Sequence, residues 1–242
     1  HNLLQFPETK SPNMSFGTAI HNTLQRAHNY LISTGNKQAI EDIVAIFEQN
    51  LIDQRLAKED FDSLVRKGCD FIRTFMNEKY DSFNSSQMTE LDFNHQNSLI
   101  GKAQITGKLD LVDMNKSSKT IIVTDYKTGK PSASWKGKDA YEKIKLHKYR
   151  QQLLFYKLLV ENSRDYHGFS VEKGMIQFVQ PDTFGNILAP LEIEFDEQEL
   201  QNFARLVEAV WSQIINLELP DTSSYEQSIK GILAFEQDLI DN

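Results

Sequence analysis

The spacing of the hydrophobic residues changes near residue 82, and this change limits the folds that the chain can adopt. Over residues 15–31, apolar side chains recur every three or four positions, as one face of an amphipathic helix requires. Similar patterns run over residues 38–51 and 58–80. The first third of the chain is therefore predicted to be helical, with Ser15 as a candidate N-cap of the first helix.

Beyond the polar stretch at residues 82–87, the pattern becomes strand-like. A long amphipathic segment at 140–161 predicts the helix that covers the sheet, and a second helix is expected over 198–217 with its start at Asp196. The tail, residues 225–240, also has a helical pattern. Strands are predicted at 89–93, 99–105, 108–114, 120–126, 174–179 and 188–195, with turns at 115–118 and 182–186.

The order of these elements predicts an α/β fold, in which a central mixed β-sheet is flanked by helices and preceded by an N-terminal helical portion. We interpret residues 1–242 as a single domain, because no clear linker divides the chain. Within it, residues 1–81 are expected to be mainly helical, 88–217 to form the sheet-helix core and 218–242 to form a helical tail. No apolar run is long enough to span a bilayer, so no membrane partner is expected.

Composition limits the chemistry and the partners. Cys69 is the only cysteine, so the chain cannot form an internal disulfide or hold a cysteine-ligated iron–sulfur cluster, and a reducing cytoplasm fits. The net charge of −8 argues against a nucleic-acid partner at first sight. Residues 127–150, however, carry eight basic residues against two acidic ones, which leaves about six positive charges. This basic segment is either a solvated helix face or a surface for phosphate groups.

The region around residues 107–130 carries the most informative polar residues. Asp110 lies on one predicted strand, and Asp125 and Lys127 lie at the end of the next. Adjacent antiparallel strands joined by a short turn can bring residues fifteen positions apart to the same end of a sheet. Asp125 and Lys127 are two positions apart, so their side chains project from the same face of a strand. We therefore expect two carboxylates and one ammonium group to converge.

This trio suits the hydrolysis of phosphodiester bonds. Carboxylate oxygens bind Mg²⁺ or Mn²⁺, which engages phosphate through its open coordination positions. A lysine beside the attacking water can orient it and stabilise the negative charge that develops on the phosphate. The alternative is that Asp110, Asp125 and Lys127 are charged residues on a solvated rim, because the D-x-K triplet alone often occurs by chance.

Four separated motifs decide between these interpretations. Residues 17–21 match a helix motif G-x-x-x-H, and residues 107–113 match a strand motif G-x-(I/L)-D-x-(I/V)-D. Residues 123–129 contain D-Y-K-T-G, and residues 152–156 match a helix motif Q-h-x-x-Y. In this order the motifs resemble the RecB-type branch of the PD-(D/E)xK nuclease superfamily, which occurs at the C-terminus of RecBCD- and AddAB-like helicase complexes and in related exonucleases. The alternation of elements extends the resemblance to about residue 217.

The resemblance implies a metal-dependent deoxyribonuclease with a restriction-endonuclease-like core. Asp110, Asp125 and Lys127 would be the catalytic residues. His21, Asp110, Asp125 and the main-chain carbonyl of Tyr126 would bind Mg²⁺ or Mn²⁺. Without the motif, His21 would be interpreted as an ordinary helix histidine.

A further set of residues is expected beside the site. Gln152 and Tyr156 are one helical turn apart and would contact DNA or orient the metal ligands. The alternative for this pair is an ordinary buried tyrosine with a hydrogen-bonded glutamine. Trp135 either stacks on an unpaired base or anchors its own loop. The basic residues expected to contact DNA or support the site are Lys130, Lys136, Lys138, Lys148 and Arg150.

The remaining polar residues receive weaker roles. Asp113 is three positions beyond Asp110 and is expected to point to the opposite face of the strand. The other histidines show no ligand spacing and are interpreted as surface or locally hydrogen-bonded side chains. They are His1, His28, His95, His147 and His167.

The resemblance also has consequences for partners. Several RecB-type nucleases carry four cysteines around an iron–sulfur cluster, so a chain with Cys69 alone is expected to belong to a cluster-free subset. Because the chain starts at His1 and the segment before the histidine motif is short, we expect a piece of a larger helicase-nuclease that acts in DNA repair or recombination. Two alternatives remain open: a catalytically silent module that binds DNA or braces a helicase, and an endonuclease that acts on RNA or modified DNA.

Overall fold

The computed structural model describes residues 11–218 and 220–241, which form two compact units. The helical unit contains residues 11–85, 126–131 and 178–188. The sheet unit contains residues 86–125, 132–177 and the described part of 189–242. Strand β5 (Thr120–Lys127) belongs to both, because the boundary falls between Asp125 and Tyr126.

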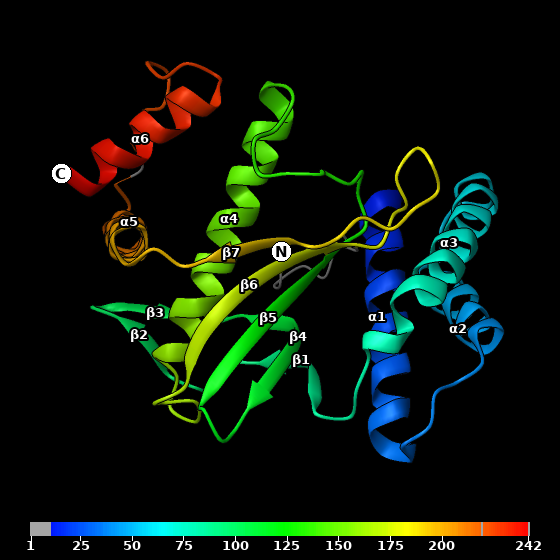
Figure 1. Cartoon of the computed structure of the whole chain (residues 1–242). Coiled ribbons are helices and arrows are strands. Elements are labelled where there is room, and N and C mark those ends of the chain that lie inside the picture. The colour runs from blue at the N-terminus through cyan, green and yellow to red at the C-terminus, as the bar shows by residue number, and fades with distance from the viewer. Residues whose placement is uncertain (1–10, 219, 242) are drawn as a thin grey trace. The chain divides into compact units, whose positions relative to one another are not determined.

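Three helices make up most of the helical unit. They are α1 (Pro12–Thr34), α2 (Ile40–Ile52) and α3 (Lys58–Lys79), and a short 3₁₀ turn, η1 (Tyr80–Ser82), follows them (Figure 1). All three predicted helices are confirmed. Residues 1–10, which belong to the predicted helical portion, lie outside the described residues.

The start of α1 differs from the prediction. Ser11 is the N-cap, because its side chain accepts a hydrogen bond from the Met14 N–H at 3.3 Å. Pro12 follows at the first helical position, where a missing N–H is tolerated. The predicted cap, Ser15, is wrong, since this residue lies inside the helix and is only 1% exposed.

The core of the helical unit is aromatic. The rings of Phe16 and Phe47 meet edge to face with their centroids 5.9 Å apart. Gly68 of α3 lies so close to them that a methyl group at this position would stand 2.0 Å from the Phe47 ring. Glycine is therefore required where α3 meets α1 and α2.

A five-stranded sheet has the order β1-β4-β5-β6-β7. The other strands are β1 (Gln87–Asp92), β4 (Lys108–Asn115), β6 (Ser170–Phe178) and β7 (Leu191–Glu194). The pairs β1–β4, β4–β5 and β6–β7 are antiparallel. Within the sheet unit, the predicted turn between β4 and β5 therefore exists and makes these strands a hairpin.

Strands β5 and β6 are connected by helix α4 (Ala140–Glu161), whose bounds match the prediction. The Ser170 N–H donates to the Lys119 carbonyl, and the Val179 N–H donates to the Lys127 carbonyl, both at 2.9 Å. From the first bond to the second, the residue numbers increase along both strands, so β5 and β6 run parallel. Because one pair is parallel and the others are antiparallel, the predicted mixed sheet is confirmed.

The segment predicted as one strand over residues 99–105 forms two. β2 (Ser98–Ile100) and β3 (Ala103–Ile105) pair with each other as a separate antiparallel hairpin. The turn between them contains Gly101 with a φ of 54°, a left-handed conformation that glycine adopts without strain. The alternating pattern continued across this turn, so the sequence alone did not show the break.

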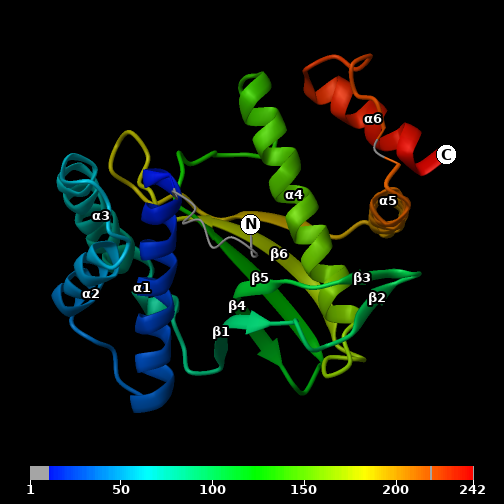
Figure 2. The ribbon, with the colours of Figure 1, turned by 180° about the vertical axis from the view of Figure 1, so that it is seen from behind.

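Two helices complete the sheet unit. Helix α5 (Glu197–Asn216) is capped by Asp196, whose side chain accepts from the Glu199 N–H at 2.8 Å, as predicted, and α6 (Ile229–Asp241) follows. Helix α5 contacts α4, α6 and the β2–β3 hairpin (Figure 2). Among the described residues, no helix is both long and apolar enough to cross a membrane.

Candidate active site

The end of β5 carries the residues on which the sequence analysis depends. Asp125 is only 2% exposed, whereas Lys127 is half-buried. These two side chains project from the same face of the strand, and Tyr126 between them projects from the other. Burial of an ionisable carboxylate is costly unless polar groups surround it, so the surroundings of Asp125 define the site.

Asp110 and Asp125 lie on neighbouring strands in direct register. Leu111 of β4 pairs with Thr124 of β5, so the preceding residue, Asp110, faces Asp125. Directly opposed residues of an antiparallel pair project from the same face, with their Cβ atoms roughly 5 Å apart. The carboxylates of both residues raise the pKa of Tyr156, in addition to the larger effect of burial. The structure thus brings together the two carboxylates that the sequence analysis predicted to converge.

Helix α4 presents polar side chains to Asp125. The Gln152 amide donates a hydrogen bond to Asp125 Oδ1 at 2.7 Å, and the Tyr156 hydroxyl donates to the same oxygen at 2.9 Å. The amide also donates to the Tyr156 hydroxyl at 2.7 Å. These bonds restrict the rotation of the carboxylate, and they place Gln152 and Tyr156 beside Asp125.

A second tyrosine of α4, which the sequence analysis did not single out, lies near the same carboxylate. Burial, followed by the negative charge of Asp125, raises the pKa of Tyr149 to about 12. Tyr149, Gln152 and Tyr156 follow one another at spacings of three and four residues, so they share one face of the helix. Near neutral pH this face presents neutral hydroxyl and amide groups to the carboxylates.

Glu90 is a third carboxylate that the sequence analysis missed. Its neighbours Thr89 and Leu91 pair with Leu111 and Leu109, which places Glu90 opposite Asp110. Carboxylate oxygens of Glu90 and Asp110 lie within 4.8 Å of each other. The sequence offered one signal, because Glu90 is an acidic residue within the strand predicted at 89–93.

The backbone and the partner of Glu90 are both unusual. Its φ is 53°, in the left-handed region that a non-glycine residue adopts only at a cost. Its carboxylate is 17% exposed and forms an ion pair with Lys108 at 2.6 Å. Lys108 lies two residues before Asp110 on β4. A strained residue that carries a charge is typical of a functional site rather than of a regular edge strand.

In the helical unit, one face of α1 contacts the end of β5. Gly17 lies against Thr128, since a Cβ atom at this glycine would stand 3.4 Å from the threonine hydroxyl oxygen. Eleven residues later on the same helix, His28 contacts the Tyr126 hydroxyl. His21 follows Gly17 by four residues and precedes His28 by seven, so it lies on the same face between the two contacts.

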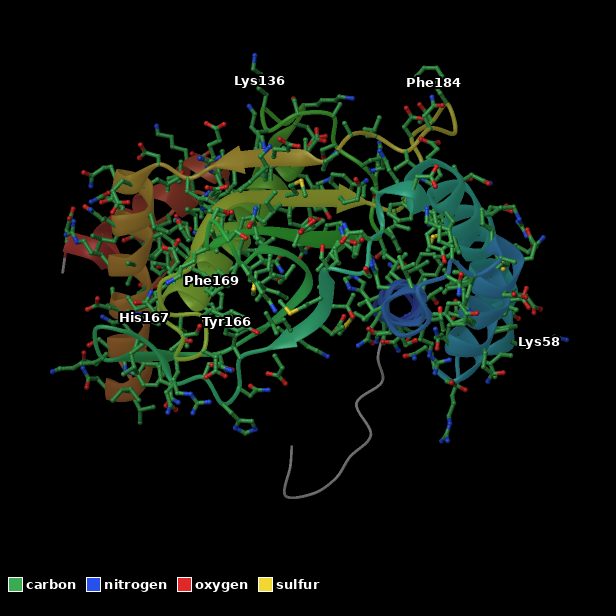
Figure 3. All side chains as sticks on the ribbon, turned by 60° about the horizontal axis from the view of Figure 1, so that its bottom comes forward. Lys58, Lys136, Tyr166, His167, Phe169 and Phe184 are labelled. Carbon is green, nitrogen blue, oxygen red and sulfur yellow. The ribbon has the colours of Figure 1, made fainter. Side chains whose placement is uncertain are left out.

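The predicted basic residues do not behave alike. Lys136 is exposed and points away from its loop (Figure 3), and the Trp135 indole anchors that loop by donating to the Glu192 carbonyl at 2.8 Å. Arg150 makes a two-pronged ion pair with Glu199 of α5, so its charge is largely neutralised. The exposed members of the set are Lys130, Lys136, Lys138 and Lys148.

The donor groups of the sheet unit suit a hard divalent cation. Glu90, Asp110 and Asp125 form a row across β1, β4 and β5, and like charges opposite one another in a sheet repel. A divalent cation that prefers oxygen ligands would offset this repulsion. The carboxylate oxygens of Glu90 and Asp110 lie within 4.8 Å of each other, close enough to share a metal ion, and the strand register places Asp125 beside Asp110.

Comparison with known proteins agrees with this geometry. The chain matches the family model of the PD-(D/E)XK nuclease superfamily over residues 1–226 of its 242 residues. The match contains Glu90, Asp110, Asp125 and Lys127. No curated protein matches the chain. The chain therefore belongs to the PD-(D/E)XK nuclease superfamily, and it is a nuclease that cleaves phosphodiester bonds.

Proposed function

We propose that this nuclease is a Mg²⁺- or Mn²⁺-dependent deoxyribonuclease of the RecB type without an iron–sulfur cluster. In this proposal it acts in the cytoplasm as an exonuclease with a helicase domain or subunit, in DNA repair or recombination. The observation that carries the metal-dependent reaction is the row formed by Glu90, Asp110 and Asp125. The helicase partner and the exonuclease action are supported by the order of the four sequence motifs.

The proposed metal ligands are the carboxylates of Asp110 and Asp125, the imidazole of His21 and the main-chain carbonyl of Tyr126. Glu90 joins this set because its carboxylate lies beside that of Asp110. When bound, the cation would polarise the phosphate and increase the acidity of a water molecule. Gln152 and Tyr156 act on the ligand set by holding Asp125 Oδ1 in one orientation.

Lys127 is proposed as the residue that orients the attacking water and stabilises charge on the phosphate. It projects from the same strand face as Asp125, two residues further along β5. Its positive charge favours the more negative transition state over the substrate.

The DNA backbone is proposed to lie along the exposed lysines of residues 130–148. Lys136 and Lys138 occupy a loop that Trp135 and Glu142 hold in place, because the Lys138 N–H donates to the Glu142 carboxylate at 2.7 Å. A fixed loop presents its charges without a further loss of backbone entropy on binding. Arg150 is proposed to support this region through Glu199 rather than to contact DNA.

The test compares variants on linear and circular DNA with Mn²⁺. Asp110→Asn and Lys127→Ala are each expected to lower kcat at least about a hundredfold. Asp113→Asn is the matched control, because this half-buried aspartate lies three positions along the same strand, and its activity is expected to equal that of the wild type. Cleavage that survives Asp110→Asn or Lys127→Ala would overturn the assigned roles.

Assays with different substrates test the exonuclease action and the choice of DNA separately. Degradation of linear but not covalently closed DNA supports exonuclease action, and preferential cleavage of RNA of the same sequence contradicts the choice of DNA. A wild-type protein that binds DNA and Mn²⁺ but does not cleave would instead be a silent module. Helicase motifs in the same polypeptide or in an adjacent reading frame would support the proposed partner.

A further inference from the structure

A buried histidine contacts the tyrosine that lies between the two proposed catalytic residues of β5. His28 has no exposed surface, and its Nε2 atom lies 3.3 Å from the Tyr126 hydroxyl oxygen. The sequence analysis interpreted His28 as a surface or locally hydrogen-bonded residue, and both alternatives are wrong because the side chain is buried and its partner is distant in the sequence. Its hydrogen-bond partner is 98 residues away in the sequence, so no local pattern predicts the contact.

The surroundings of His28 keep its imidazole neutral. The ring stacks on Phe83 with a centroid distance of 3.6 Å and an interplanar angle of 10°. The rings of Phe75 and Tyr126 meet nearly at right angles with their centroids 5.9 Å apart. Burial lowers the pKa of His28 to about 3. A neutral imidazole has one donor and one acceptor nitrogen, so His28 acts through its hydrogen bond rather than through a charge.

Packing alone does not explain a histidine at this position. The second ring nitrogen, Nδ1, is buried and has no hydrogen-bond partner among the residues that the structure describes. A buried polar atom without a partner lowers stability, whereas an apolar side chain such as that of Leu24, one turn earlier on α1, carries no such penalty. The property that His28 has and leucine lacks is the contact with the Tyr126 hydroxyl.

This contact connects two groups of the proposed metal centre within the helical unit. His28 lies on the face of α1 that also carries His21. Tyr126 supplies the proposed main-chain ligand and precedes Lys127 directly. A bond between α1 and the Tyr126 side chain therefore limits the movement of the Tyr126 main chain relative to His21.

We propose that His28 is a positioning residue, which holds Tyr126 so that its carbonyl and the adjacent Lys127 keep their places relative to His21 when a divalent cation binds. The inference rests on the proposed function, because it takes His21 and the Tyr126 carbonyl as metal ligands. Removal of an outer residue that orients a metal ligand typically weakens metal binding about ten- to a hundredfold.

The experiment measures Mn²⁺ binding by titration calorimetry, in the absence of DNA, for the full chain. Tyr126→Phe removes a single oxygen atom, and His28→Leu removes the other partner with little change in volume. Each is expected to raise the Kd for Mn²⁺ about tenfold and to lower kcat on DNA while leaving KM for DNA unchanged. The double variant is expected to resemble the single variants, because both remove the same contact.

Two further variants separate positioning from stability. His28→Gln offers an amide to Tyr126 and is expected to recover part of the lost Mn²⁺ affinity. Ile43→Val removes one methylene from a fully buried position of α2 and is expected to lower Tm without changing the Kd. The Tm of His28→Leu is expected to equal or exceed that of the wild type, because the unpaired nitrogen is removed.

Failure of this inference is distinguishable from failure of the proposed function. If the wild type binds Mn²⁺ and cleaves DNA but Tyr126→Phe keeps the wild-type Kd and kcat, His28 is a packing residue and the inference is wrong. If the wild type does not bind Mn²⁺, both are wrong. Because Tyr126→Phe is a minimal change, the test does not depend on whether His28→Leu folds.

Discussion

Asp125 and Tyr126 are neighbours in β5, but the two units support them in different ways. In the sheet unit, Asp125 Oδ1 receives two hydrogen bonds from one face of α4, and these two donors also bond to each other. In the helical unit, the Tyr126 hydroxyl meets His28, whose other nitrogen has no partner in the described part of the unit. One side chain is held by a connected network and the other by a contact within an aromatic core.

This difference suits the two kinds of metal ligand that are proposed at the end of β5, a side-chain carboxylate and a main-chain carbonyl. A carboxylate that binds a cation must keep its orientation while its charge is neutralised, and a network of neutral donors achieves this. A main-chain carbonyl needs only a fixed backbone, which the anchored Tyr126 ring provides. The comparison predicts that disturbing the network changes catalysis most, whereas the aromatic side makes the stability of the fold depend on pH through His28.

The largest effect is expected from Asp125. Asp125→Asn keeps an oxygen for Gln152 and Tyr156 but removes the negative charge, so kcat with Mn²⁺ should fall at least about a hundredfold while Tm stays near the wild-type value. Asp125→Ala should lose activity to the same extent and also about 1–3 kcal/mol of stability, because the buried Tyr156 hydroxyl and the half-buried Gln152 amide lose their acceptor. Steady-state cleavage and urea unfolding of both variants check this.

The outcome for stability separates two roles of the network. Equal unfolding free energies of the asparagine and alanine variants would mean that the bonds to Asp125 do not stabilise the fold. A clear difference would show that they do.

The next largest effect is expected from the donors on α4. Tyr156→Phe and Gln152→Leu each remove one bond to Asp125 Oδ1 and should lower kcat about ten- to a hundredfold. Lys157→Gln, at the position directly after Tyr156 in α4, is a control that changes a charged side chain paired with Glu161 instead. If Tyr156→Phe and the control lower kcat equally, the network has no special role.

The histidine side of the comparison predicts a pH effect on stability. The pKa of His28 is lowered from 6.5 to about 3, so between these values the unfolded chain binds a proton that the folded chain does not. His28 therefore does not reduce the free energy of unfolding above about pH 6.5, and this free energy decreases progressively as the pH falls below that value. From pH 7 to pH 5 the loss should be roughly 2 kcal/mol, at about 1.4 kcal/mol per pKa unit.

Urea unfolding of the wild type and of His28→Leu at both pH values measures this loss. Other groups titrate alike in the two proteins, so the difference between their pH dependences isolates His28. Parallel pH dependences would show that His28 can be protonated in the folded state, which contradicts its burial.

The sequence predicted the elements of the fold well, because hydrophobic spacing follows the geometry of helices and strands. The long helix α4 was predicted over its observed range, since its hydrophobic pattern is a local feature. The break at Gly101 was missed because the alternation of β2 continues in β3 across the turn. The start of α1 was misplaced because Ser11 and Ser15 are both good caps, and only Pro12 distinguishes them.

The site was predictable where it depends on register within a hairpin and not where it depends on contacts between distant elements. Asp110 and Asp125 converge because a short turn joins their strands. Glu90 enters through the pairing of β1 with β4, and the contact of His28 with Tyr126 depends on the packing of α1. Glu90 could be noticed as an acidic residue within a predicted strand, but neither contact could be predicted, because the residues in each contact are separated by at least twenty positions.

The smallest effects are expected on the basic segment, where exposed and paired charges can be compared. Replacing Lys136 and Lys138 together by alanine should raise KM for DNA and reduce the slope of log K against log salt concentration by up to about two, one for each phosphate contact. Arg150→Ala should leave this slope unchanged and lower stability by about 1 kcal/mol or less, because its half-buried partner is Glu199. Binding of a labelled oligonucleotide at several salt concentrations, without a metal ion, gives both slopes. A reduced slope for Arg150→Ala would mean that this arginine leaves Glu199 to contact phosphate. Its ion pair with Glu199 would then exist only in the absence of DNA.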